Sequence, residues 1–536
     1  MNDFLTEKPE LKKTLSSSPK QDPVASRRSL ALKASIFATG LAGIVAEYVM
    51  ATIASYLVGN AVVQWTMIIS VMLFAMGVGS RLSKYVLHNV LDTFILAELG
   101  LSLLCAISAI AAYFFTSYVQ QVWLVIYPIA FSIGILIGIE IPLATRLNQY
   151  FEELRFNISS VMEKDYFGSL LGGLLFAFVA LPHLGLTYAP IALGTVNLLV
   201  AGILFWHFRA LVKHPKFLTA GFVTVPLLLI GLGVMAEPIV LYGEQQRYQD
   251  RVIYQEQTMY QKIVITEWKD YYWLYLDNNE QFSSYDEERY HEPLVHPTMM
   301  LSASRENILI MGGGDGLAVR EVLKHPEVKT VTVVDIDPKM TDLARTHPVF
   351  VKLNEHAFDD SRVKIVNRDA YAYLKDSAEL YDVIIVDLPD PKTIELARLY
   401  TKEFYSLSKQ HLSKGGTIVT QATSPLFAAD AFICILKTME AAGLSSVGMH
   451  NHVPTMGEWG WIIGINEEHV TPAMMKEQLS KMEFDGIKTR FLNHEAMLSM
   501  LNFGKGILDR SEGVQINDER NLILQSYYRQ GSWALF

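Results

Sequence analysis

Carboxylates that follow short apolar runs are the residues of this chain best suited to chemistry. One of them, Asp315, lies in the glycine-rich loop 312–316 (GGGDG), between an apolar run and a helix-like segment. Glycines such as Gly312, Gly314 and Gly316 let the backbone turn tightly and approach a ligand closely. The pattern predicts a nucleotide-type ligand at a helix N-terminus, although an aspartate there would repel the anionic groups that such sites usually bind.

The elements that must position Asp315 are those of a doubly wound, Rossmann-like α/β domain, which we expect over residues 301–536. Apolar runs alternate with helical stretches, which is typical of a mostly parallel sheet with helices on its faces. In such a sheet, ligands bind beyond the carboxyl ends of the strands. The expected strands are 307–311, 331–335, 363–367, 382–387 and 416–421, with 444–453 and 460–465 as edge strands.

Further carboxylates follow these strands and are expected to converge on one rim. Asp335 comes about 20 residues after the glycine loop, where an acidic side chain binds ribose hydroxyls. Asp369 and Ala370 follow the third strand, where a carboxylate can accept a hydrogen bond from the exocyclic amine of adenine. Asp337 is better explained as a helix N-cap, because a proline follows it. Together these residues indicate an adenosyl ligand.

The negative charge of Asp315 reduces the number of adenosyl ligands that fit the loop. The loop resembles that of the S-adenosylmethionine-dependent methyltransferases, in which it lies near the amino-acid end of the cofactor. An aspartate would repel the carboxylate at that end but attract the bare ammonium of decarboxylated S-adenosylmethionine. In this interpretation decarboxylated S-adenosylmethionine is a co-substrate. It donates its aminopropyl group to an amine, which displaces methylthioadenosine.

Two more carboxylates, Asp387 and Asp390, share a turn after the fourth strand and suit a cationic acceptor. An alkylamine has a pKa near ~10 and must lose a proton before or as it attacks. Asp387 is placed to accept that proton as a general base, and Asp390 to hold the other ammonium of a diamine.

At this point residues 259–465 resemble the spermidine synthases, or polyamine aminopropyltransferases. The stretch YQKIVI resembles the family's Tyr-Gln strand, and the resemblance puts Gln261 on methylthioadenosine. LYLDNNEQFSSYDEERYHE resembles its Leu-Asp-Gly…Tyr-His-Glu stretch, which puts Tyr290 and His291 at the polyamine.

The remaining motifs support the same resemblance. GGGDG…REV is similar to the family's strongest signature, with Asp315 on the aminopropyl amine. Asp335 stands where the family usually has a glutamate on the ribose, and Asp369-Ala370 matches its adenine pair. DLPDP matches D-x-x-D-P, which implies Asp387 as the proton acceptor and Asp390 as an amine ligand. The resemblance implies dimers or tetramers and no metal ion.

Two departures from the family pattern touch the nucleoside or acceptor pocket. The Gly-Pro expected after D-x-x-D-P is missing from PDPKTIELARLY, and Met456 in VPTMGEWGW replaces a tyrosine that lines the amine site. Putrescine remains the expected acceptor, with another diamine or a longer polyamine as alternatives.

The first half of the chain predicts a different environment. The 536 residues are 51% hydrophobic, with a mean hydropathy of +0.22, and the apolar residues concentrate in long segments. Each segment can cover about 30 Å of hydrocarbon as a helix of about 20 residues. The expected spans are 31–57, 62–80, 93–117, 122–143, 166–186, 189–207 and 218–240.

These spans predict four regions. Residues 1–28 form a polar, basic tail, 29–242 a polytopic membrane domain of about seven helices, and 243–300 a small antiparallel β domain, followed by the catalytic domain 301–536. Lys269-Asp270 and Asn278-Asn279 are the expected turns of the small sheet. The layout resembles the longer bacterial spermidine synthases that carry a membrane domain, which implies a multi-pass protein of the inner membrane in contact with lipid.

Two arguments disagree about the side of the membrane that carries the catalytic domain. Basic residues fall in alternate loops with the N-terminus, so the positive-inside rule and an odd number of spans place the catalytic domain outside. The donor is made in the cytoplasm, and on that ground we expect the catalytic domain there. Three glutamates, Glu47, Glu98 and Glu140, lie in or near the spans, where carboxylates are functional by default; Glu140 is expected at the membrane interface.

The whole-chain charge and the cysteines exclude several classes. A net charge of −10 argues against nucleic acid and suits a polycationic substrate. Cys105 and Cys434 lie in different apolar segments, so we expect neither a disulfide framework nor a zinc site. Two rival functions remain: an S-adenosylmethionine-dependent methyltransferase, and a membrane polyamine sensor or transporter with a ligand-binding domain.

Overall fold

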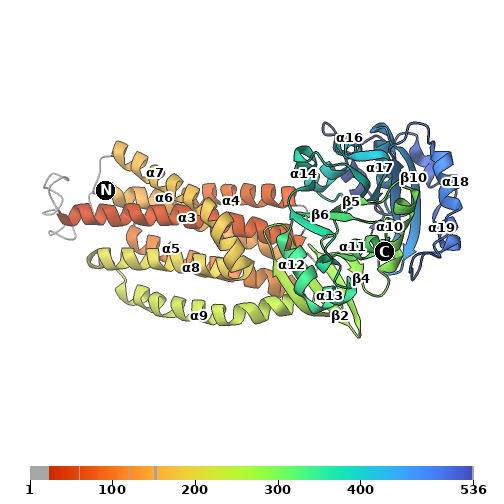
Figure 1. Cartoon of the computed structure of the whole chain (residues 1–536). Coiled ribbons are helices and arrows are strands. Elements are labelled where there is room, and N and C mark those ends of the chain that lie inside the picture. Colours follow the sequence, from red (N-terminus) through yellow and green to blue (C-terminus); the bar gives the residue numbers. More distant parts are fainter. Residues whose placement is uncertain (1–22, 59–60, 117, 120, 150–153, 534–536) are drawn as a thin grey trace. The chain divides into compact units, whose positions relative to one another are not determined.

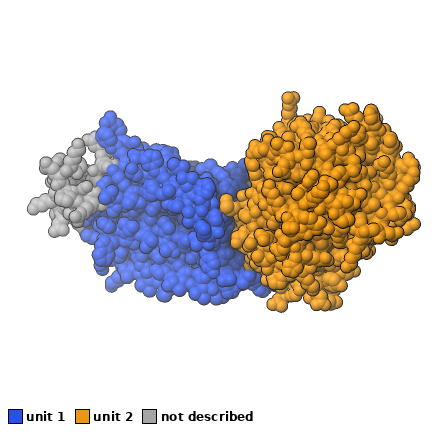
Figure 2. Space-filling view, viewed as in Figure 1, with its two compact units in different colours: residues 1–249 blue, residues 250–536 orange. Residues whose placement is uncertain are grey.

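The computed structural model describes residues 23–58, 61–116, 118–119, 121–149 and 154–533 of the chain. It divides into two compact units, residues 1–249 and 250–536, which Figure 2 colours separately. The first unit is helical and the second holds two β-sheets. Most of the predicted N-terminal tail, residues 1–22, lies outside the described residues, and helix α3 begins at Pro23.

Among the residues that the structure describes, six helical stretches of the first unit are long and apolar enough to cross a membrane, by length and composition alone. One of the six, the continuous stretch Arg155–Leu211, has 57 residues. At 1.5 Å per residue it would measure about 85 Å, nearly three times the thickness of a hydrocarbon core. It breaks at Gly185, where φ is 60° and ψ is −172°, so it contains two of the seven predicted spans. The helical segments are α3 (Pro23–Val58), α4 (Ala61–Ser83), α5 (Val90–Thr116), α6 (Trp123–Asn148), α7 (Leu154–Leu175), η1 (Phe176–Ala180), α8 (Leu181–Phe208), η2 (Arg209–Leu211) and α9 (Pro215–Gln245).

Successive helices of the bundle point in opposite directions (Figure 1). The helix ends that carry basic residues therefore lie at the same end of the bundle. Ser29, at the start of α3, donates a hydrogen bond to Asn148 at the end of α6, and Arg146 donates one to the carbonyl of Ser83 at the end of α4. At the other end, Tyr56 of α3 donates to Glu244 of α9. The chain therefore leaves the bundle at the end opposite to that at which α3 begins.

The structure places Glu140 farther from a helix end than the sequence indicated, and its expected position at the membrane interface stays a prediction. Helix α6 continues through Pro142 to Asn148, so Glu140 lies two turns before its end, and its side chain is buried inside the bundle. A proline within a helix is tolerated where neighbouring helices pack closely around it. The helix is packed in this way at Gly138, where a Cβ atom would lie 2.1 Å from the carbonyl oxygen of Met76 in α4.

The second unit begins with a four-stranded antiparallel sheet in the order β1-β2-β3-β4. The predicted turn at Lys269-Asp270 is present, but the next turn centres on Asp277 and Asn278, one residue earlier than predicted. Both residues have positive φ angles, 48° and 65°, as a two-residue type I′ hairpin turn requires. The strands are β1 (Arg251–Gln257), β2 (Lys262–Trp268), β3 (Tyr271–Leu276) and β4 (Asn279–Ser283).

The larger sheet has seven strands in the order β10-β11-β9-β8-β5-β6-β7, and Figure 1 shows helices on both of its faces. Strands β9, β8, β5, β6 and β7 are parallel, and the β10–β11 hairpin adds antiparallel pairs. The predicted strand positions are confirmed, but only β10 of the hairpin is an edge strand. The strands are β5 (Asn307–Gly312), β6 (Thr330–Asp335), β7 (Val363–Asn367), β8 (Tyr381–Asp387), β9 (Leu412–Gln421), β10 (Ser445–Val453) and β11 (Gly457–Ile465).

The central strands are fully buried because helices cover both faces, which explains their uninterrupted Val and Ile content. One hydrophobic core packs α10, α11, α18 and α19 on one face, and a second packs α14, α16, α17 and α20 on the other. The helical segments are α10 (Glu288–Leu301), α11 (Leu317–Leu323), α12 (Pro338–Thr346), α13 (Pro348–Leu353), η3 (Ala357–Asp359), α14 (Ala370–Asp376), α15 (Ile394–Ala397), η4 (Arg398–Tyr400), α16 (Lys402–Gln410), α17 (Ala429–Ala441), α18 (Pro472–Ser480), α19 (His494–Met500), η5 (Leu508–Ser511) and α20 (Leu524–Arg529).

Candidate active site

The glycine loop and Asp387 meet because β5 and β8 are neighbouring parallel strands. Gly312 pairs with Asp387 in the sheet register, and the Gly313 amide donates a 3.1 Å hydrogen bond to the Asp387 carbonyl. Gly312 has a φ of 82°, and a Cβ atom there would lie 2.0 Å from the same carbonyl oxygen. Glycine is therefore required for the close approach of the loop to the end of β8.

Asp335, at the end of β6, lies on the other side of the loop. A Cβ atom at Gly314 would lie 2.5 Å from its Oδ2, so the glycine makes room for the carboxylate. Burial, with the nearby charge of Asp337, raises the pKa of Asp335 to about 6, although hydrogen bonds from backbone amides act against this rise. A carboxylate in this position has few water molecules to bind and is suited to accept hydrogen bonds from hydroxyl groups of a ligand.

Asp337 has the capping role that the sequence indicated. It is the N-cap of α12, its Oδ1 accepts from the Lys339 amide at 3.1 Å, and it is fully buried. Its Oδ2 accepts from Gln261 Nε2 at 3.0 Å and from Thr258 at 2.8 Å. Gln261, the residue expected on methylthioadenosine, is thereby fixed beside the end of β6.

Asp369 also caps a helix, a role that the sequence analysis gave only to Asp337. It is the N-cap of α14, and its Oδ1 accepts from the Ala372 amide at 2.8 Å. Ala370, the first residue of α14, is buried. Capping uses one carboxylate oxygen, so the other keeps its capacity to accept a hydrogen bond.

Asp387 lies at the centre of the site. Its Oδ1 accepts a 2.8 Å hydrogen bond from the Tyr290 hydroxyl. Burial raises its pKa to about 6; the positive charge of His291 lowers it and the negative charge of Asp315 raises it further. Asp315 itself accepts from the Leu317 amide at 2.8 Å, and burial raises its pKa as well. A cation bound between the two carboxylates would stabilise their ionised forms.

His291 is held as a cation by Glu287, one turn earlier in the chain. Its Nδ1 lies 2.9 Å from the Glu287 carbonyl and 3.0 Å from the Glu287 carboxylate. Burial alone would lower the pKa of His291, but the hydrogen bond and charge of Glu287 outweigh burial and raise it to about 9. Arg320 and Arg490 both form ion pairs with the same glutamate.

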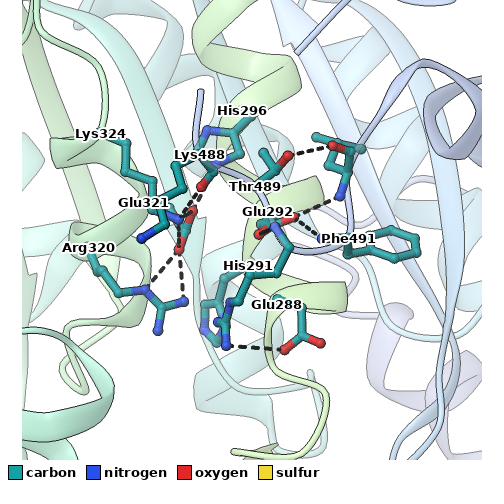
Figure 3. Close-up of polar contacts among 12 residues, drawn as sticks. Glu288, His291, Glu292, His296, Arg320, Glu321, Lys324, Lys488, Thr489 and Phe491 are labelled. Carbon is teal, nitrogen blue, oxygen red and sulfur yellow. Dashed lines mark hydrogen bonds and ion pairs between the residues drawn. The ribbon is translucent and has the colours of Figure 1, made fainter. Parts of the chain in front are cut away.

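The ion pairs continue behind His291, as Figure 3 shows. Glu321 lies between Arg320, Lys324 and His296, with contacts of 2.8, 2.6 and 2.9 Å. Glu292 accepts from backbone amides of the segment 490–492. The network joins α10, α11 and the loop before α19, and so fixes the helix that carries Tyr290 and His291.

Asp390 has partners that the sequence analysis did not identify. Its Oδ2 accepts a 2.8 Å hydrogen bond from Tyr528 in α20, and its Oδ1 accepts a longer one, at 3.4 Å, from Gln421 at the end of β9. Burial raises the pKa of Asp390, and the nearby Lys392 ammonium acts against this rise. Tyr528 lies outside every recognised motif, whereas Lys392 stands in the segment that lacks the family's Gly-Pro.

Lys392 ties the turn after β8 to the small sheet. Its Nζ donates to the side-chain oxygen of Asn279 in β4 and lies 5.7 Å from the ring centroid of Tyr528. Its carbonyl accepts from Gln525 of α20 at 2.9 Å. Met456 lies in the β10–β11 turn and packs against the hydrophobic core that contains Tyr290.

The geometry defines an acidic, cation-accepting site at the carboxyl edge of a methyltransferase-like sheet. Residues 287–477 match the family model described as the spermine/spermidine synthase domain. The chain is similar to polyamine aminopropyltransferase 2 of Aquifex aeolicus, with 44% identity over 93% of this chain and 98% of the relative. It is also similar to the polyamine aminopropyltransferase of Oceanobacillus iheyensis, with 38% identity over 87% of this chain and 90% of the relative.

Among solved structures, the chain is similar to a spermidine synthase in complex with the transition-state analogue AdoDATO. That match has a TM-score of 0.43 and 27% identity, over 48% of this chain and 88% of the other. The sequence relatives establish that the chain belongs to the polyamine aminopropyltransferase family. The predicted family and enzyme class are confirmed, and the family's co-substrate is decarboxylated S-adenosylmethionine.

The His291–Glu287 pair makes a testable contribution to stability. The folded-state pKa of His291 is raised from 6.5 to about 9, so its stabilising effect is complete below pH 6.5 and is lost as pH rises through about 9. Full loss would amount to on the order of 3 kcal/mol. The thermal midpoint of the wild type should therefore fall between pH 6.5 and 9. In Glu287→Gln, most of that fall should be absent.

The control is Glu306→Gln, which removes an exposed ion pair with Lys329 and should preserve the pH dependence of the wild type. Thermal unfolding of the full chain in detergent, scanned at several pH values, measures both variants. An unchanged slope in Glu287→Gln would contradict the assignment of a charged His291.

Proposed function

We propose that this protein transfers the aminopropyl group of decarboxylated S-adenosylmethionine to putrescine, giving spermidine and methylthioadenosine. The observation that carries the proposal is the convergence of Asp315 and Asp387 near the His291 cation, at the end of a sheet that also carries Asp335. Such a site favours a ligand with a terminal ammonium and a sulfonium over one with a carboxylate.

The donor contacts follow from the positions of these side chains. Asp335 binds the ribose hydroxyls, Gln261 lies along methylthioadenosine, and Asp369 with Ala370 borders the adenine. Gly312 and Gly314 bring the backbone close to the donor, and Asp315 accepts from its ammonium. The support for these roles is that each residue lies at or beside the carboxyl end of β5, β6 or β7, where doubly wound sheets bind ligands.

The reaction is a displacement at the carbon next to sulfur. The lone pair of the attacking amine forms the new C–N bond while the C–S bond breaks, and its electrons neutralise the sulfonium to give methylthioadenosine. Asp387 accepts the proton that the amine loses. Tyr290 fixes this carboxylate through a 2.8 Å hydrogen bond, and Asp390 and His291 border the acceptor amine.

The assay for this function supplies the detergent-purified full chain with decarboxylated S-adenosylmethionine and putrescine and follows both products by mass spectrometry. Asp387→Asn should lower kcat by about 10²–10⁴, because a positioned general base contributes a factor of that order. In the wild type, kcat/KM should fall as pH drops through about 6, where Asp387 takes up a proton.

Asp376→Asn is the matched control, because Asp376 is an exposed aspartate at the end of α14. It should turn over as the wild type does. Binding of the donor without release of methylthioadenosine, with any amine offered, would refute the proposal and favour a sensor.

The helical unit would embed the enzyme in the bacterial inner membrane, with its catalytic unit in the cytoplasm, where the donor is made. Support for a membrane comes from six long apolar helical stretches, one of which breaks at Gly185. Seven crossings would leave the basic ends, marked by Arg81, Arg146 and Arg209, on the outer side, against the positive-inside rule. The supply of donor is the stronger constraint, because an enzyme without its co-substrate has no function.

A protease test distinguishes the two orientations. In spheroplasts, an epitope tag placed after Phe536 should resist external protease and become sensitive only after lysis. Digestion of the tag in intact spheroplasts would reverse the orientation and require export of the donor. A periplasmic marker protein and a cytoplasmic one provide the two controls.

A further inference from the structure

A second group of carboxylates lies within the helical unit, in a separate compact unit from the candidate active site. Glu98 of α5 is fully buried, and Glu140 of α6 is 1% exposed. Glu98 Oε1 accepts a 2.8 Å hydrogen bond from Thr39 of α3. Three helices therefore contribute to one buried polar layer.

The carboxylates of this layer are close enough to influence one another. Glu140 lies within electrostatic range of Glu98 and of Asp165 in α7, and the Cys105 thiol lies near both glutamates. Asp165 faces α3, because a Cβ atom at Gly40 would lie 2.8 Å from its Oδ1. Like charges gathered in this way are unfavourable unless the carboxylates take up protons or a cation is added.

Several polar atoms of the layer have no hydrogen-bond partner within the part of the chain that the structure describes. They are Glu98 Oε2, both carboxylate oxygens of Glu140, Ser102 Oγ and Asn197 Oδ1. Each belongs to a side chain that is at least 99% buried. Four of the five atoms can only accept hydrogen bonds while the glutamates are ionised, and a serine hydroxyl can accept as well.

Helix packing directs Ser102 and Asn197 toward the same level. Ser102 follows Glu98 by one turn of α5 and shares its face. Gly194 of α8 packs against that turn, since a Cβ atom there would lie 2.4 Å from the Ser102 carbonyl. Helices α5 and α8 are antiparallel, so we infer that Asn197, one turn beyond Gly194, lies near the level of Glu98.

While the two glutamates are ionised, this set of buried acceptors requires a donor or a cation. A buried anion without compensation costs several kcal/mol even after the protein relaxes, and ionisable groups inside a membrane bundle mark ion or substrate sites by default. An ammonium group has three donors and no acceptor, which complements this set. Among the described residues, neither Glu98 nor Glu140 has a salt bridge to Lys, Arg or His.

We propose that the polar layer around Glu98 and Glu140 binds the ammonium end of a polyamine. The choice of polyamine rests on the proposed function, because the same chain would make or consume that ligand. Apolar side chains packed in the same bundle, such as Ala46, Ile133 and Leu193, suit the methylene segments between ammonium groups. The helical unit then carries a polyamine site of its own.

Equilibrium binding of radiolabelled putrescine and spermidine to the full chain in detergent tests this site. The wild type should bind two polyamines per chain, and Glu140→Gln or Glu98→Gln should bind one, with at least a tenfold loss of affinity at the bundle site. Release of methylthioadenosine should stay unchanged in both variants, which also reports that they are folded. Glu163→Gln, at an exposed position of α7, is the control and should bind two.

A background of Asp387→Asn with Asp390→Asn separates the two sites. In that background one polyamine should remain bound, and adding Glu140→Gln should remove it. If the catalytic function fails because the second unit binds no polyamine, the wild type binds one polyamine and Glu140→Gln still removes it. If Glu140→Gln leaves the number bound unchanged in every background, the bundle site is refuted.

Carbodiimide labelling provides a second measurement that does not depend on a variant. A hydrophobic carbodiimide reacts with buried protonated carboxyl groups, and mass spectrometry identifies the modified glutamate. Spermidine should protect Glu140 at the concentrations that saturate binding. Labelling that spermidine does not slow, or that only sodium ions slow, would show that protons or metal ions compensate the layer and would overturn the proposal.

Discussion

The crowding of carboxylates at the carboxyl edge of the seven-stranded sheet is the constraint on which the site depends. Asp335 and Asp387 end neighbours of the same strand, β5, and burial raises the pKa of each to about 6. Asp315, in the loop that follows β5, adds its negative charge to both of these carboxylates. The fold holds this repulsion in place, and binding of a cation converts it into attraction.

The surrounding structure gives apparently similar aspartates different tasks. Asp337 and Asp369 cap helices through their carboxylates, so they organise the backbone that follows β6 and β7. Asp387 accepts from Tyr290, and Asp390 from Tyr528. A hydroxyl partner fixes a carboxylate without neutralising it, which preserves its charge for a cationic substrate.

Local patterns predicted much of this arrangement, and long-range contacts account for the rest. Strands β5 to β9, the glycine loop and the rim aspartates follow from apolar periodicity and glycine placement, which act within a few residues. Tyr528 lies 138 residues from Asp390, and Arg490 lies 203 residues from Glu287, so neither partnership has a local signal. The burial of Glu140 was missed for the same reason, because it depends on neighbouring helices that pack around a proline.

The two units share one electrostatic feature: each contains buried carboxylates with fewer positively charged partners than negative charges. In the catalytic unit, Lys392 and His291 supply part of the compensation from within the protein. In the helical unit, no described cation pairs with Glu98 or Glu140. Under the proposed function the substrates and the product are polycations, which gives the enzyme a use for both kinds of site.

The most direct test of the account compares the binding of decarboxylated S-adenosylmethionine with that of S-adenosylmethionine, by calorimetry on the full chain. The account predicts that the wild type binds the decarboxylated form about 100-fold more tightly, since about 3 kcal/mol separates attraction from repulsion at Asp315. Asp315→Asn should reduce that preference to less than tenfold. Equal affinity of the wild type for both molecules would contradict the role of Asp315 and, with it, the central claim that the acidic rim selects a donor ending in an ammonium.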